Sequence, residues 1–421
     1  MISLRGGSLV TPGGPVRTDL GIVDDRIAWI GDGPGGDQDL DCTGCLIGPG
    51  FVDIHVHFRE PGQTWKEDIA SGSRAGAAGG FTAVVTMANT DPAADSRRLV
   101  ESMMVRGRQV GLLDLSPAAA LTLGRAGGAV SPVEDLWEAG VRIFSDDGDA
   151  VGRPEVLREA MERIAQLGGV VAQHAEDAGL TAGGHMHEGA VSSELGIGGL
   201  PAEAEEQIVA RDLELVRESR VHYHVQHVST AGTVELVRAA RAGGLPVTAE
   251  AAPHHFSLDH RRLAGRNTNL KMYPPLRTEH DVAAVVAAVR DGTIDAVATD
   301  HAPHTEDEKN VAFEEAPRGV IGLETSAPIT WSILEEDPVA FFERMSVAPA
   351  RIAGMAEQGR WLEVGEVANV VVFAPGAVWT PEQFESKSQN SPWMGSQLRG
   401  RSVATIYRGR LTHRRRINKE G

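Results

Sequence analysis

Two histidines separated by one residue, His55 and His57, are the pair in this sequence best suited to metal chemistry. They lie in segment 51–58, whose apolar and β-branched residues are typical of a strand. Side chains two apart on a strand project from the same face, so the two imidazoles could bind one cation together. The pair alone is equally consistent with a structural role, and the rest of the chain has to decide.

Further histidine and aspartate residues stand at the ends of short apolar runs along the chain. His174, His227 and Asp300 each stand where such a run ends. The pattern predicts strands over 51–58, 81–87, 112–123, 141–146, 170–176, 221–229, 246–252 and 296–300. Helical periodicity lies between them, for example over 154–167, 202–218 and 230–242.

Eight strands alternating with helices predict an α/β chain built on a (β/α)8 TIM-type barrel. We place this barrel at residues 49–357. Segments 1–48 and 358–421 consist of short strands and turns, and we expect both to form one small flanking β-sandwich domain.

Barrel geometry brings distant residues together, because the carboxyl ends of all the strands meet at one mouth. The side chains expected there are His55, His57, His174, His227 and Asp300. Four neutral imidazoles and one carboxylate would leave two divalent cations poorly compensated, so a further anion is needed. The fourth strand ends in Asp146-Asp147. Strand alternation lets only one of these two aspartates point into the mouth, and the pattern does not say which.

Composition limits the partners. The chain has 421 residues and a formal net charge of -18, which argues against nucleic acid or an anionic membrane as a partner. An anionic small molecule would need a local basic group. We expect a cytoplasmic protein, because no signal peptide or membrane-spanning run is evident. Cys42 and Cys45 form a lone C-x-x-C, which we interpret as structural or incidental thiols.

Three motifs together resemble class I dihydroorotases of the amidohydrolase superfamily. They are Pro49-Gly50-Phe51-Val52-Asp53-Ile54-His55-Val56-His57-Phe58-Arg59-Glu60-Pro61-Gly62, Thr86-Met87-Ala88-Asn89-Thr90 and Thr299-Asp300-His301-Ala302-Pro303-His304. The resemblance extends through essentially the whole chain. It implies a zinc-dependent hydrolase that reversibly opens dihydroorotate to N-carbamoyl-L-aspartate in pyrimidine biosynthesis.

The resemblance also implies a ligand set for two zinc ions per chain. His55, His57 and Asp300 would bind the first zinc, His174 and His227 the second, and Asp147 would bridge both. Many relatives use a carboxylated lysine as the bridge. The fourth strand has no lysine, so the chain resembles the branch with an aspartate bridge, whose metal loading should not require bicarbonate.

Catalytic and substrate-binding roles follow from the same resemblance. Asp300 would accept a proton from the attacking hydroxide and deliver it to the departing amide nitrogen. Arg59 would pair with the substrate carboxylate, with Asn89 and His304 beside it. The chain departs from the family at Tyr273, where asparagine is usual, and at Arg318, where phenylalanine is common. We expect Arg318 and Gly319 to meet the substrate through backbone groups.

Alternative functions remain open at this point. The chain could be another cyclic amidohydrolase, of hydantoinase or allantoinase type, or a non-catalytic partner of aspartate carbamoyltransferase. An active enzyme could also associate with that transferase or with further copies of itself. We expect the polar stretch 305–319 to act as a lid, and we expect His222 and His224, of opposite strand parity to His227, to face the helices.

Overall fold

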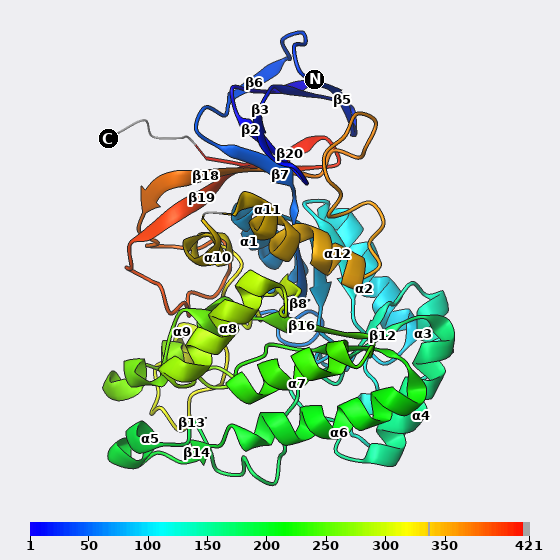
Figure 1. Cartoon of the computed structure of the whole chain (residues 1–421), viewed down its shortest axis with the longest axis vertical. Coiled ribbons are helices and arrows are strands. Elements are labelled where there is room, and N and C mark those ends of the chain that lie inside the picture. Colours follow the sequence, from blue (N-terminus) through cyan, green and yellow to red (C-terminus); the bar gives the residue numbers. More distant parts are fainter. Residues whose placement is uncertain (336, 416–421) are drawn as a thin grey trace.

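The computed structural model describes residues 1–335 and 337–415, and it confirms an α/β architecture. β1–β7, in blue, and β18–β20, in orange to red, lie together at the top of Figure 1. The green helices α4, α6, α7 and α8 cover the outside of the lower part. Within the described residues, no helix is both long and apolar enough to span a membrane.

The lower part is built on eight parallel strands in two sheets, ordered β10-β9-β8 and β11-β12-β15-β16-β17. A parallel bridge from Ala119 to Phe144 joins the residues after β10 to β11, and one from Val56 to His301 joins β8 to the residues after β17. The succession of pairings therefore returns to its first strand. The strands are β8 Phe51–Val56, β9 Phe81–Thr86, β10 Asp114–Pro117, β11 Ile143–Phe144, β12 Val170–Gln173, β15 His222–Val225, β16 Val247–Ala251 and β17 Ala296–Val297.

Helices connect these strands, and local signals fix their ends. Pro154 occupies the first turn of α4 and Gly168 caps its end with φ +76°. Thr278 begins α8 in a capping box with Asp281. The helices are α1 Ile69–Gly79, α2 Arg97–Val110, α3 Val133–Glu138, α4 Pro154–Leu167, α5 Ala190–Leu195, α6 Glu203–Ser219, α7 Ala231–Ala242, α8 Glu279–Asp291, α9 Glu306–Lys309, α10 Ser326–Leu334, α11 Pro338–Phe342 and α12 Ala348–Ile352.

The strands are shorter than the sequence pattern predicts. The expected strand over 112–123 is regular only at 114–117, and the one over 221–229 ends at Val225. As a result His174, His227 and Asp300 lie one to three residues beyond a strand, in irregular backbone. His227 and Asp300 have φ of +31° and +47°, so strand alternation does not extend to them.

The upper part consists of two sheets, ordered β5-β4-β1-β6 and β20-β19-β18-β7-β2-β3. Antiparallel pairing of β7 with β18 brings the two ends of the chain into one sheet. Both sheets contribute to a separate apolar cluster that includes Leu4, Ile22, Ile47 and Val372. The strands are β1 Ile2–Arg5, β2 Ser8–Thr11, β3 Gly14–Arg17, β4 Leu20–Val23, β5 Arg26–Ile30, β6 Gln38–Asp41, β7 Leu46–Pro49, β18 Val370–Trp379, β19 Leu398–Tyr407 and β20 Arg410–Arg414.

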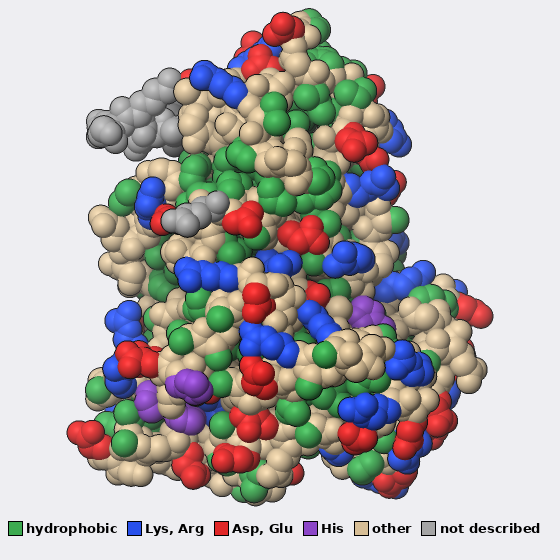
Figure 2. Space-filling model, in the orientation of Figure 1, with side chains coloured by type: hydrophobic (Ala, Val, Ile, Leu, Met, Phe, Trp, Pro, Cys, Tyr) green, Lys and Arg blue, Asp and Glu red, His purple; other side chains and the backbone are tan. Residues whose placement is uncertain are grey.

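A single residue, Gly50, separates β7 of the upper part from β8 of the lower part. A side chain at this position would collide with Thr82, because a Cβ would lie 2.2 Å from its Cγ2. On the face that Figure 2 presents, acidic and basic side chains are interspersed, and no continuous basic area is seen. That distribution agrees with the net negative charge.

Candidate metal centre

Six polar side chains from the ends of five strands meet at one point in the molecule. They form two overlapping groups around a shared carboxylate, His55-His57-Asp147 and Asp147-His174-His227, with Asp300 beside the first. All six are at least 94 % buried. The structure thus brings together every residue that the resemblance implies as a metal ligand.

Asp147 lies at the centre of this cluster, where its Oδ1 faces imidazoles of both groups and its Oδ2 faces the first group. Its Oδ1 is 3.2 Å from His55 Nε2, 3.5 Å from His227 Nε2 and 3.7 Å from His174 Nδ1. Its Oδ2 is 3.5 Å from His57 Nε2. The neighbouring Asp146 turns away and accepts hydrogen bonds from the backbone N–H and the hydroxyl of Thr122. The alternative that the sequence pattern left open therefore resolves to Asp147.

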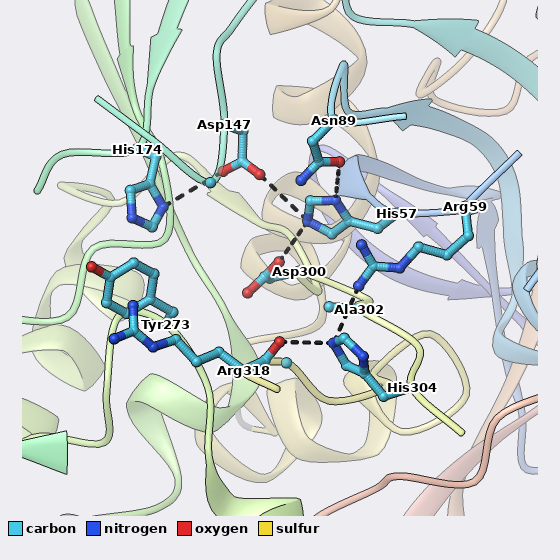
Figure 3. Close-up of a pocket in the computed structure, with 12 residues that line it drawn as sticks. His57, Arg59, Asn89, Asp147, His174, Tyr273, Asp300, Ala302, His304 and Arg318 are labelled. Carbon is cyan, nitrogen blue, oxygen red and sulfur yellow. Dashed lines mark hydrogen bonds and ion pairs between the residues drawn. The ribbon is translucent and has the colours of Figure 1, made fainter. Parts of the chain in front are cut away.

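Asp300 approaches from the opposite side, with Oδ1 3.0 Å from His57 Nε2 and 3.6 Å from His55 Nε2 (Figure 3). Asp300, His227 and Arg59 all have positive φ, at +47°, +31° and +58°. Residues with side chains rarely adopt this conformation, and where they do they cluster at functional sites. The strained backbone marks the same place as the side-chain cluster.

Several buried polar atoms in the cluster have no hydrogen-bond partner among the residues that the structure describes. They are His55 Nε2, Asp147 Oδ1, His174 Nε2 and His227 Nδ1. His174 Nδ1 and His227 Nε2 lie 2.8 Å apart. Buried polar groups are normally paired by hydrogen bonds. Nitrogen and oxygen atoms that converge without such partners can instead offer their lone pairs to a cation. The residues present fit a bound metal.

The two carboxylates of the cluster are ionised. Burial would raise the pKa of Asp147, but the charge of His55 and the close approach of the His174, His227 and His55 imidazoles hold that pKa well below its usual range. Burial likewise opposes ionisation of Asp300, yet the hydrogen bond from His57 and nearby imidazolium charge lower its pKa. Both groups can therefore offer negative charge to a cation near neutral pH.

Hydrogen bonds orient the two histidines of the first group. His55 Nδ1 contacts Glu250 Oε1 at 2.6 Å, and His57 Nδ1 contacts Asn89 Oδ1 at 2.8 Å. Because these oxygens are acceptors, each Nδ1 carries the proton and each Nε2 is left to face Asp147. Asn89 thus orients His57 in addition to lining the pocket. Sequence reasoning missed Glu250, although a carboxylate within the apolar run 247–251 is a detectable signal.

The expectation for His224 is wrong. It is buried beside the cluster, where its Nε2 donates to Glu250 Oε2 at 3.1 Å, in a chain that continues to His55. His222, two residues earlier on the same strand, contacts the Thr248 hydroxyl that His224 also contacts. The parity argument failed because it counted back from His227, whose positive φ breaks the alternation. Cys42 and Cys45 are free and buried, away from this site.

The cluster opens into a cavity of about 260 Å³ (Figure 3). Its lining residues are His57, Arg59, Asn89, Asp147, Gly148, His174, Tyr273, Asp300, Ala302, His304, Arg318 and Gly319. All six expected substrate-binding residues are among them. The cavity is small and polar, so it suits a compact polar ligand.

Arg59 and His304 are neighbours in the lining of this cavity. Burial lowers the pKa of Arg59 to about 10, which leaves its guanidinium charged near neutral pH. Burial, with the charges of Arg59, Lys309 and Lys66, lowers the pKa of His304 to about 2, so this imidazole is neutral. His304 Nε2 donates to the Arg318 carbonyl at 2.8 Å. Arg59 therefore supplies the positive charge here.

Solved structures with a similar fold include hydantoinases. An L-hydantoinase (dihydropyrimidinase) from Arthrobacter aurescens aligns with a TM-score of 0.88 at 22% identity, over 98% of this chain and 96% of that chain. A D-hydantoinase aligns with a TM-score of 0.82, also at 22% identity, over 98% and 95%. The chain therefore has the fold of this class of enzymes.

Comparison with sequence relatives identifies the family within this class of enzymes. A family model described as dihydro-orotase-like matches residues 44–233. A dihydroorotase from Pelobacter propionicus is 43% identical over 98% of this chain and 99% of its own length, and one from Mycobacterium bovis is 43% identical over 94% and 95%. The chain belongs to the dihydroorotase family.

Proposed function

We propose that this chain is a dihydroorotase, a hydrolase of cyclic amides that reversibly converts dihydroorotate to N-carbamoyl-L-aspartate. The observation that carries the proposal is the meeting of four imidazoles and two carboxylates at the base of a cavity whose other side holds Arg59. Full-length relatives that carry the same name support it. The substrate and the product are both small anions, which Arg59 suits.

We further propose that two zinc ions bind here, one at each group around Asp147. His55, His57 and Asp300 would hold the first ion, His174 and His227 the second, and Asp147 would be shared by both. The position of one carboxylate within 3.7 Å of all four imidazoles supports this shared role. Bound cations of this kind activate a water molecule as nucleophile and polarise the carbonyl that it attacks.

The chain's own groups would then bind the substrate and move the proton. Asp300 accepts the proton of the attacking water and passes it to the departing amide nitrogen. Arg59 pairs with the ring carboxylate, the Asn89 amide N–H₂ group and His304 lie next to it, and backbone groups of Arg318 and Gly319 border the ring. In the reverse direction the Asp300 carboxylate takes the proton from the attacking amide nitrogen and gives it to the departing water as the ring closes.

The first test is turnover with a specific loss at Arg59. Zinc-loaded protein should hydrolyse dihydroorotate, and Arg59→Met should raise KM about ten- to a hundredfold, because a hydrogen-bonded charge is worth about 1.5–3 kcal/mol. Arg59→Lys should recover only part, because an ammonium lacks the planar pair of donors. Arg97→Met, at an exposed position on α2, is the control. No turnover of dihydroorotate alongside turnover of hydantoin would contradict the proposal.

A second test concerns Glu250, which we propose orients His55. Burial would raise the pKa of Glu250, but the charge of His55 and hydrogen bonds from His224 and His55 hold it well below its usual range, so it is a carboxylate. Glu250→Gln should weaken zinc binding about 10–100-fold in competition with a chelator, the usual cost of losing such a partner. Glu324→Gln, at a largely buried glutamate outside the cluster, should leave zinc affinity unchanged.

Domain organisation and partners complete the proposal. The closed succession of parallel pairings supports a (β/α)8 barrel over 49–357, and the apolar cluster shared by the two upper sheets supports a β-sandwich formed by 1–48 and 358–421. A non-catalytic role beside aspartate carbamoyltransferase is disfavoured by the complete ligand set. Binding to that transferase, self-association and a cytoplasmic location stay predictions.

A further inference from the structure

The two side chains that depart from the family pattern, Tyr273 and Arg318, contact each other. The Arg318 guanidinium carbon lies 3.8 Å from the centroid of the Tyr273 ring. The same ring lies 4.9 Å from the His174 ring at an interplanar angle of 37°. Figure 3 shows these three side chains gathered on one side of the cavity, opposite Arg59, with the Tyr273 hydroxyl pointing away from Arg59. The ring of Tyr273, and not its hydroxyl, contacts the site.

Two buried lysines hold the segments that carry this pair. The Lys271 ammonium donates to the carbonyls of Phe313, Glu314 and Ala316 at 2.7, 3.0 and 2.7 Å. The Lys309 ammonium donates to those of Thr268, Lys271 and Pro317 at 3.0, 3.4 and 2.8 Å. These six hydrogen bonds to backbone carbonyls hold segments 268–273 and 309–318 against each other. This attachment sets Arg318 over Tyr273.

His174 differs from His55 and His57 in how it is held. The ring nitrogens of His55 and His57 that face away from Asp147 bond to Glu250 and Asn89. The corresponding Nε2 of His174 is buried, and among the described residues it has no hydrogen-bond partner. Apart from the 2.8 Å contact of its Nδ1 with His227 Nε2, the orientation of this imidazole depends on packing, and the Tyr273 ring packs against it.

We propose that Tyr273 and Arg318 act as one positioning pair, in which the guanidinium holds the aromatic ring against His174 and so fixes the ligand nitrogen of that imidazole. The inference rests on the proposed metal function of the cluster. Arginine suits the role because its planar cation stacks on an aromatic face while its N–H groups still reach outward. Here Arg318 Nη2 also donates to the Gly184 carbonyl at 2.8 Å, which anchors the far end of the pair.

Zinc affinity measured by chelator competition on the full chain tests the pair independently of turnover. Tyr273→Phe keeps the ring and should bind zinc as the unmodified protein does. Tyr273→Leu and Arg318→Met should each weaken binding of one of the two zinc ions about tenfold, the lower range for loss of a ligand-orienting contact. Arg318→Lys should resemble Arg318→Met, because the flexible ammonium does not stack.

A double-variant cycle distinguishes a coupled pair from two separate contacts. The combined Tyr273→Leu/Arg318→Met variant should lose no more zinc affinity than Tyr273→Leu alone, because Arg318 acts through the ring. Arg266→Met removes a similar arginine–carbonyl contact, to Leu195, and should have no effect. Additive losses, or a Tyr273→Phe variant as weak as Tyr273→Leu, would overturn the inference.

The same measurements separate this inference from the proposed function. If the unmodified protein binds two zinc ions but does not turn over dihydroorotate, the proposed activity fails while the coupling can still be read from zinc affinity. If single and double variants lose kcat but bind zinc normally, the proposed activity stands and the positioning role fails. Melting temperatures of the zinc-free variants should stay equal, and a fall that tracks the zinc loss would count against positioning.

Discussion

Replacing Asp300 by asparagine is expected to lower kcat about 10²–10⁴-fold, the usual contribution of a positioned acid–base group. Asparagine keeps the shape of the side chain but cannot accept the proton of the attacking water. Zinc content should fall little, because His55, His57 and Asp147 remain around the first site. Ring opening of dihydroorotate gives the rate, and elemental analysis of dialysed protein gives the zinc content.

The location of Asp300 makes this result diagnostic. Its Oδ1 lies 3.0 Å from His57 Nε2, and its side chain borders the cavity. A group that only bound metal would lose zinc and activity together when replaced. Retention of full zinc with a kcat close to that of the unmodified protein would show that another group carries the proton, and our assignment of Asp300 would be wrong.

The second large effect is expected at Asp147, where asparagine should abolish stable binding of both zinc ions and with it all turnover. One carboxylate faces all four imidazoles, and a neutral amide cannot supply an anionic oxygen to each side. The unmodified protein should also take up zinc fully in buffer freed of carbon dioxide, because an aspartate bridge needs no carboxylation. Zinc stoichiometry after dialysis measures both effects.

The neighbouring residue provides the matched control. Asp146 is also buried, but its oxygens accept hydrogen bonds from Thr122. Asp146→Asn should therefore retain zinc while losing about 1–3 kcal/mol of unfolding free energy, the cost of a disrupted buried hydrogen bond. Two zinc ions bound to Asp147→Asn, or uptake that needs bicarbonate, would rule out an aspartate bridge.

The pattern of polar and apolar residues, together with proline and glycine at the ends of elements, was enough to predict much of the fold. Helix α4 begins at Pro154 and ends at Leu167 as expected, because proline and the following Gly168 fix its ends locally. The polar residues at strand ends identified the cluster, because parallel strands deliver their carboxyl ends to one place. The periodicity of one strand could not foresee the positive φ of His227, which depends on what surrounds it.

Contacts between distant segments are what the sequence could not supply. Glu250 bonds to His55 only because strands far apart in the sequence converge. Lys309 donates to the Lys271 carbonyl because the loop that carries it folds back onto that segment, which no local pattern encodes. The stacking of Arg318 on Tyr273 is of the same kind. The sequence shows which residue stands at each of these positions, and Tyr273 and Arg318 already differ from the family pattern. It does not show which residues they contact.

The pairing of β7 with β18 has a consequence for how the molecule is made. β7 precedes β8, the first strand of the lower part, whereas β18 follows α12, the last helix of that part. During synthesis the ribosome must therefore release the entire lower part before β7 can pair with β18. Until then the apolar cluster lacks the side chains that β18 and β19 supply, among them Val370, Val372 and Ile406, so this sheet is completed last.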